Sequence, residues 1–123
     1  MNTKQFINET NRLFSSDYLN SLPTESPYET SSRQLDRKVK SYLKSILPEA
    51  KIFGFKGGFC ETSGFVEMNG KFVYISIPDV RFNRNWSNDI LIRTARDEHD
   101  YAGGRNNYTT VERLSTDIMN MVK

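Results

Sequence analysis

An Asn-Gly pair at Asn69-Gly70 constrains the fold of this 123-residue chain more than any other sequence feature. Asn-Gly is the preferred centre of a type I′ turn, which joins two antiparallel strands through a two-residue loop. The flanking segments alternate in character, so we predict a hairpin over residues 62–77. The turn also sets the register of the two strands, and it places Phe65 opposite Tyr74.

Strand alternation sorts the side chains of this hairpin onto two faces. The aliphatic face is predicted to be the core face, and it consists of Val66, Met68, Val73, Ile75 and Ile77. The other face is aromatic with polar interruptions, and it consists of Phe65, Glu67, Phe72, Tyr74 and Ser76. If helices cover the aliphatic face, the aromatic face is left open or is covered by a partner.

The segment before the hairpin predicts two helices. A short helix is expected over residues 3–14, and the stretch 21–32, with two prolines and many Ser and Thr residues, is typical of a linker. Ser31 and Gln34 form a capping box, which predicts the start of a second helix that ends shortly before Pro48.

Two more strands and a last helix complete the prediction. Residues 51–55 and 90–95 have strand character, and Thr109 with Glu112 forms a second capping box. Consecutive strands with segregated helices indicate the α+β class. We expect an antiparallel four-stranded sheet, with the N-terminal helices and the C-terminal helix packed on one of its faces.

The whole chain has the composition of a soluble domain. Its 17 basic and 15 acidic residues give a net charge of +2, too small to indicate a polyanion partner by itself. We expect an N-terminal helix and linker over residues 1–30 and a single α+β domain over residues 31–123. The single cysteine, Cys60, allows no internal disulfide, and no apolar run is long enough for a signal peptide or a membrane span. These features predict a cytoplasmic protein.

The sequence contains no recognisable catalytic or metal-binding constellation. The single histidine, His99, lies in the acidic run of residues 97–100, and neighbours in a loop do not converge on a tetrahedral metal site. This run is expected to be a polar loop facing water. The chain also lacks a nucleophile elbow, a P-loop and a dinucleotide fingerprint. We therefore expect a binding protein with no metal, no cofactor and no catalytic residue.

Arginine replaces lysine in the C-terminal part of the chain, because six arginines and no lysine lie between Lys71 and Lys123. A guanidinium grips phosphate through two hydrogen bonds and stacks on rings, so arginines beside aromatics suit a ligand with a phosphate and a ring. Gly103-Gly104 precedes the predicted last helix, where backbone N–H groups attract anions. The predicted ligand-binding residues are Trp86, Arg93, Arg96, Tyr101, Arg105, Asn106, Asn107 and Tyr108.

Each of these residues also has a purely structural interpretation. Gly103-Gly104 fits a plain turn, Tyr108 fits a contact that anchors the helix start, and the arginines fit surface loops tied by local salt bridges. A basic stripe on the second helix is equally open, because it suits a solvated helix face or a contact to a phosphate backbone. The stripe consists of Arg33, Arg37, Lys40 and Lys44.

A pattern of short motifs precedes the last helix: Leu91-Ile92-Arg93-Thr94-Ala95, then Asp100-Tyr101, then Gly103-Gly104-Arg105-Asn106-Asn107. With this pattern, residues 53–122 resemble a group of small phage-encoded proteins, the anti-Thoeris proteins of the first type. The resemblance implies an antiparallel sheet, a helical N-terminus used for assembly, and pockets at subunit interfaces that sequester cyclic ADP-ribose-like immune signals. The implied ligand contacts are Arg93, Arg105, Asn106, Asn107 and Trp86. The chain departs from the pattern in having no arginine after Arg113.

Two functions remain in competition at this level. The first is a homo-oligomeric, non-catalytic counter-defence protein that binds a nucleotide-derived signal in the cytoplasm of a phage-infected host cell. The second is an inhibitor of a nucleic-acid-targeting defence enzyme, similar to anti-CRISPR proteins, or a small nucleic-acid-binding protein. The second function depends on the basic stripe, and it predicts binding that weakens steeply with salt.

Overall fold

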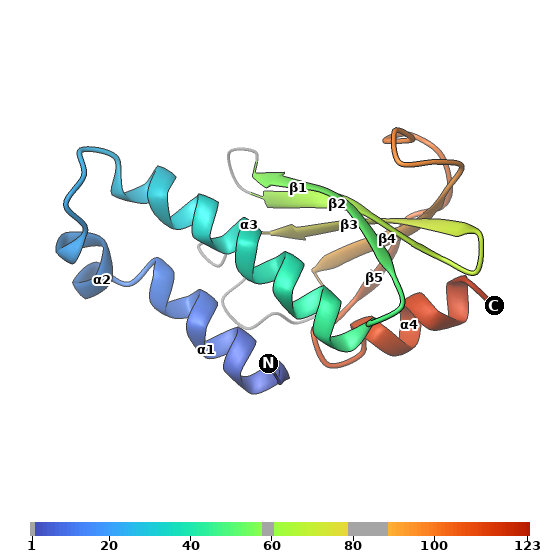
Figure 1. Cartoon of the computed structure of the whole chain (residues 1–123), viewed down its shortest axis with the longest axis horizontal. Helices are drawn as coiled ribbons and strands as arrows, with labels where there is room; N and C mark the ends of the chain where they lie inside the picture. Colours follow the sequence, from blue (N-terminus) through green and yellow to red (C-terminus); the bar gives the residue numbers. More distant parts are fainter. Residues whose placement is uncertain (1, 58–60, 79–88) are drawn as a thin grey trace.

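The computed structural model describes residues 2–57, 61–78 and 89–123, so Cys60 and Trp86 lie outside the described residues. Four helices and five strands are present in the described part of the chain (Figure 1). Their order is α1 (Thr3–Leu13), α2 (Ser16–Ser21), α3 (Pro27–Ile46), β1 (Lys51–Gly57), β2 (Glu61–Met68), β3 (Lys71–Pro78), β4 (Ile90–Ala95), β5 (Asn107–Thr109) and α4 (Leu114–Met121).

The strands form one antiparallel sheet in the order β1-β2-β3-β4-β5, so the predicted α+β class is confirmed. The hairpin register is confirmed as well, with Phe65 opposite Tyr74. The prediction of four strands was wrong, because residues Asn107–Thr109 add a fifth strand to the edge of β4. Three residues are too few to show alternation, and only the backbone of β4 makes them a strand.

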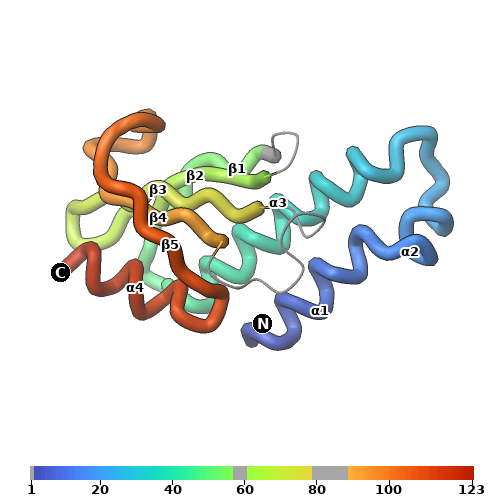
Figure 2. The backbone as a smooth tube through the Cα atoms, turned by 180° about the vertical axis from the view of Figure 1, so that it is seen from behind, coloured from blue at the N-terminus to red at the C-terminus, as the bar shows by residue number. Residues whose placement is uncertain are grey.

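Helices cover the aliphatic face of the sheet. Val66, Val73 and Ile75 are fully buried in one hydrophobic cluster that also includes residues of α1, α3 and α4. Burial of such side chains is the main stabilising contribution to a domain of this size. Figure 2 shows α1 lying along α3, and the two helices are joined by a stack of Phe6 on Tyr42 with ring centroids 4.2 Å apart.

The N-terminal helices differ from the prediction in their boundaries. Helix α1 begins as predicted, with Asn2 as its N-cap. The capping box expected at Ser31 was wrong, because α3 begins at Pro27, a residue whose fixed φ suits the first helical position. Ser31 is buried inside α3, where its hydroxyl donates to the carbonyl of Leu13 over 2.6 Å. The stretch expected to be a linker is therefore helical from Pro27 onward, and α2 precedes it.

The last helix begins later than expected. The capping box predicted at Thr109 was wrong, because Thr109 belongs to β5 and its hydroxyl donates to the Asp117 carboxylate over 2.6 Å. Helix α4 begins at Leu114, and its N-cap residue, Arg113, makes no side-chain capping bond. Backbone pairing of residues 107–109 with β4 is therefore favoured over the helix start that the capping box predicts.

A bulge in β1 turns Phe55 into the core. The register of β1 on β2 shifts between Gly54 and Lys56, and Phe55 has a positive φ of 63° with its side chain fully buried. Gly64 of β2 lies opposite Gly54 in this pairing. A Cβ at Gly64 would lie 2.3 Å from the Phe53 carbonyl oxygen, so the close approach of the two strands requires glycine there.

None of the helices in the described part of the chain has both the length and the apolar composition that crossing a membrane requires.

Candidate functional site

The aromatic face of the sheet is covered by a loop of the same chain. Residues 96–106 connect β4 to β5 and rise above the sheet (Figure 1, orange). The Tyr101 ring packs edge-on against Phe65 and Tyr74, with centroids 5.0 and 5.8 Å away. Phe65 is consequently 0% exposed and Tyr74 is 8% exposed. The expectation that this face stays open or needs a partner was therefore wrong for its centre.

Arg93 of β4 holds this loop in place. Its guanidinium carbon lies 4.5 Å from the centre of the Tyr74 ring, a cation–π contact. One terminal nitrogen donates to Asn106 Oδ1 over 3.2 Å, and the other donates to the Tyr101 carbonyl oxygen. The Nε atom is buried and has no hydrogen-bond partner among the described residues. Arg93 thus acts first as a structural clamp, and one of its donors remains unused.

Asp100 organises the loop from within. Its carboxylate accepts hydrogen bonds from the backbone N–H groups of Arg96 over 3.0 Å, Gly103 over 2.8 Å and Ala102 over 3.4 Å. The bonds from Arg96 and Gly103 are the main reason why the pKa of Asp100 lies below its ordinary value. The prediction of a polar loop facing water was wrong for this residue, which is buried.

Gly103 and Gly104 pack closely, Gly103 against Asp100 within the loop and Gly104 against β4 of the sheet. A Cβ at Gly103 would lie 2.4 Å from Asp100 Oδ2, and one at Gly104 would lie 2.1 Å from the Thr94 carbonyl oxygen. Gly104 also has a positive φ of 79°. The expected position before a helix N-terminus was wrong, because β5 and a turn separate these glycines from α4. Their observed role is close packing, and the helix end adds nothing to anion binding here.

Four predicted residues gather on the aromatic face. They are Arg93, Tyr101, Asn106 and Tyr108. Tyr108 lies opposite Leu91, two residues from Arg93 on the same face of β4. Tyr101 is 57% exposed and Tyr108 is 61% exposed, so each presents a ring to solvent beside the clamp. Figure 2 shows the loop and β5 at the same end of the sheet.

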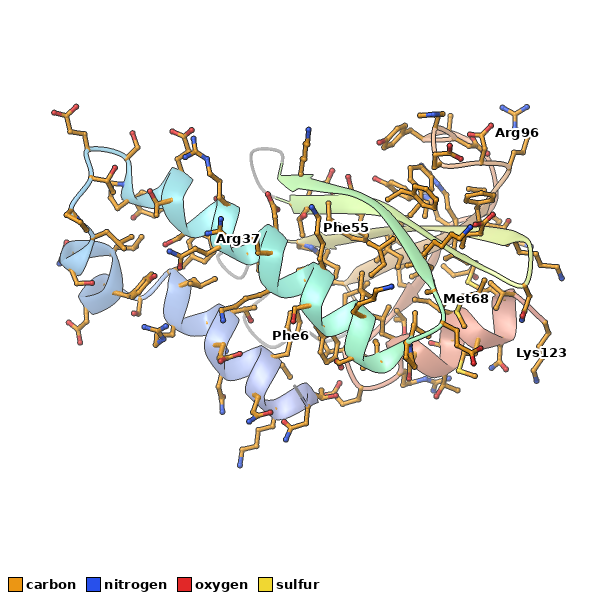
Figure 3. All side chains as sticks on the ribbon, viewed as in Figure 1. Phe6, Arg37, Phe55, Met68, Arg96 and Lys123 are labelled. Atoms are coloured by element: carbon orange, nitrogen blue, oxygen red, sulfur yellow. The ribbon has the colours of Figure 1, made fainter. Side chains whose placement is uncertain are left out.

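The remaining predicted residues lie beside this group or apart from it. The Arg96 side chain points outward from the loop (Figure 3) and pairs with Asp100 over 3.6 Å. Arg105 is exposed, and its side chain has no partner in the described ranges. Asn107 pairs with Ile92 and so belongs to the opposite face, and its amide donates to the Arg105 carbonyl over 3.0 Å. Trp86 lies outside the described residues.

The basic stripe of α3 is exposed, as expected for a solvated helix face. Arg33 pairs with Glu29, and Lys44 donates to the Ala50 carbonyl over 3.1 Å. Within the described ranges, the side chains of Arg37 and Lys40 form no ion pair or hydrogen bond. Among the described residues, no three His, Cys, Asp or Glu side chains lie close enough to hold a metal ion.

Strand alternation in the sequence placed Phe65 and Tyr74 on one aromatic face but did not predict that they support the loop of residues 96–106 through Tyr101. Sequence reasoning also missed Asp100, whose carboxylate organises that loop. Asp100 followed by Gly103 is a turn signal that was available in the sequence, because an Asp carboxylate often accepts bonds from the next few backbone N–H groups. No family model, curated protein or solved structure matches this chain.

Proposed function

We propose that this protein binds a nucleotide-derived anion of the cyclic ADP-ribose class and sequesters it without chemical change. One observation carries the proposal: two exposed tyrosines lie on the same face as Arg93, a half-buried arginine whose buried Nε–H lacks an acceptor among the described residues. A buried donor without a partner costs free energy, and a ligand oxygen would satisfy it. Tyrosine rings stack on bases, and guanidinium groups bind phosphates.

The proposed contacts divide between ring and phosphate. Tyr101 and Tyr108 stack on the base, since both are more than half exposed. Arg105 binds a phosphate, because it is exposed and its charge is unpaired within the described chain. The Asn106 oxygen already accepts from Arg93, so its amide nitrogen is left to donate to the ligand.

The biological role follows from the ligand class and from the resemblance to anti-Thoeris proteins of the first type. In this proposal the protein is phage-encoded, acts in the host cytoplasm as a homo-oligomer, and removes an immune signal by binding it. A second copy of the chain would enclose the ligand, since both tyrosines are more than half exposed. No covalent step is required, so the signal is released unaltered when the protein unfolds.

The test uses cyclic ADP-ribose as the probe. At a concentration 100 times its dissociation constant, a ligand that binds only the folded protein raises the free energy of unfolding by about 3 kcal/mol. Tyr108→Ala is expected to weaken binding by roughly 1–3 kcal/mol, the usual contribution of one stacked base. Tyr28→Ala is the matched control, because Tyr28 is an exposed tyrosine on α3. Isothermal titration calorimetry measures both variants.

Two results would overturn the proposal. One is the absence of any stabilisation by cyclic ADP-ribose and related nucleotides. The other is recovery of a chemically changed ligand, which mass spectrometry of the denatured complex detects. The alternative, a polyanion-binding inhibitor, predicts that Lys40→Glu with Lys44→Glu abolishes the biological effect. We favour the ligand site because two of the four stripe residues have partners within the chain.

A further inference from the structure

A groove of about 340 Å³ lies between α1 and α3, away from the aromatic face. Its lining residues are Arg12, Gln34, Arg37, Lys38 and Ser41. The four residues from α3 recur at i, i+3, i+4 and i+7, so they form one continuous face of that helix. Figure 3 shows Arg37 on the flank of α3 that faces α1.

The described residues that line the groove have positive or neutral polar side chains, and each offers a hydrogen-bond donor. None of its five lining residues is acidic. Lys38 Nζ lies 3.6 Å from Glu9 Oε2, so one of the three cations is paired inside the protein. Arg37 has neither an ion pair nor a hydrogen bond with any residue of the described ranges. Two uncompensated guanidinium groups therefore face the same space.

Tyr18 of α2 holds two of these donors in place. The Arg12 guanidinium carbon lies 4.6 Å from the centre of the Tyr18 ring. The Tyr18 hydroxyl donates to Gln34 Oε1 over 2.5 Å. Because this oxygen is occupied as an acceptor, the amide nitrogen of Gln34 is the group that remains for a ligand. A single aromatic side chain thus orients a charged donor and a neutral donor at the same groove.

We propose that this groove binds the phosphate group of a small organic phosphate. Two free guanidinium groups match the charge of a phosphate monoester, which is about −1.5 to −2 at neutral pH. The planar forks of Arg12 and Arg37 suit bidentate contacts to its oxygens, and Gln34 adds a neutral donor. The volume falls at the low end of small-molecule sites, about 300–1,000 Å³, so there is room for a phosphate with a short organic group.

This site is independent of the aromatic face. The two share no residue, and they lie on different elements, α1 and α3 against β4 and β5. A probe without a ring separates them, because it cannot use the stacking tyrosines. Glycerol 3-phosphate is such a probe, and glycerol is its counterpart without the phosphate.

The experiment measures binding of both probes to the full chain by isothermal titration calorimetry. Glycerol 3-phosphate is expected to bind and glycerol is not. Arg12→Gln and Arg37→Gln remove the charge while retaining a polar side chain, and each is expected to weaken binding at least about tenfold, as loss of a charge-assisted hydrogen bond does. Arg33→Gln is the matched control, since Arg33 is an exposed arginine of α3 that pairs with Glu29 and does not line the groove.

Three outcomes overturn the proposal. The first is equal heats for the two probes. The second is a loss in Arg33→Gln as large as that in Arg37→Gln, which indicates general surface charge. The third is binding of a twelve-nucleotide single strand with no binding of glycerol 3-phosphate, which indicates a nucleic-acid surface. Circular dichroism melting of each variant verifies that folding is retained, which is expected because Arg12 and Arg37 are exposed.

Discussion

Gly104 is the residue on which closure of the loop over the aromatic face depends most directly. Its φ is 79°, and a Cβ there would lie 2.1 Å from the Thr94 carbonyl oxygen of β4. Backbone in the left-handed region costs a residue with a Cβ about 1–2 kcal/mol. The contact with Thr94 forces a backbone shift as well, and overpacking of this kind costs about 1–3 kcal/mol more. Gly104→Ala is therefore expected to destabilise the protein by roughly 2–5 kcal/mol.

Gly70 offers a matched control. Its φ is 74°, close to that of Gly104, but a Cβ there meets nothing within 4 Å. Gly70→Ala therefore has the free-energy cost of a positive φ but no steric clash of its Cβ. The loss of chain entropy in the unfolded state is the same for Gly70→Ala and Gly104→Ala. The difference between the two variants isolates the contact with Thr94.

Urea unfolding followed by circular dichroism measures the two free energies. Hydrogen exchange adds a local measurement, because the N–H groups of Arg96 and Gly103 donate to the Asp100 carboxylate within the loop. If the loop detaches alone, these amides exchange faster in Gly104→Ala and the global free energy changes less. Equal stability and equal exchange in both variants would refute the packing role that we assign to Gly104.

Two further predictions test the sheet and the loop. Gly64→Ala places a Cβ 2.3 Å from the Phe53 carbonyl oxygen. It is expected to lower the free energy of unfolding by about 3 kcal/mol or more, measured by the same urea unfolding assay. A loss no larger than that of Gly70→Ala contradicts the close approach of β1 and β2. The pKa of Asp100 is lowered in the folded protein, so its ionised form stabilises the fold above the unfolded pKa of roughly 4. This contribution is lost as the pH falls through the folded pKa. As the pH is lowered through this range, the free energy of unfolding of Asp100→Asn is expected to fall less steeply than that of the unsubstituted protein. Parallel pH profiles of the two proteins would contradict the stabilising role of the Asp100 carboxylate.

Local sequence signals predicted the elements whose structure depends on near neighbours. Asn69-Gly70 predicted both the hairpin and its register, because the stereochemistry of a type I′ turn is set by the turn residues themselves. The alternation beyond the turn predicted the core face, which buries Val66 and Val73. The pattern after Asn2 predicted α1, since helical periodicity is a property of consecutive residues.

Boundaries failed where distant contacts outweigh local preference. Ser31 looked like a cap, but its hydroxyl meets the carbonyl of Leu13, 18 positions earlier in the chain. Thr109 looked like a cap as well, but pairing with β4 makes it part of a strand. A capping bond is worth about 1 kcal/mol, and a few tertiary contacts exceed that.

The residue types available for a ligand can be read from the amino-acid sequence: arginines, asparagines and tyrosines within one C-terminal window. How these side chains are used depends on the fold. It assigns Arg93 to the clamp on Tyr74 and Asn106, and it leaves Tyr101 and Tyr108 exposed. The sequence specifies the identity of each side chain, whereas the partner of each hydrogen-bond donor depends on how the loop closes over the sheet. In that closure Gly104 packs against the Thr94 carbonyl of β4, and Gly103 packs against the Asp100 carboxylate.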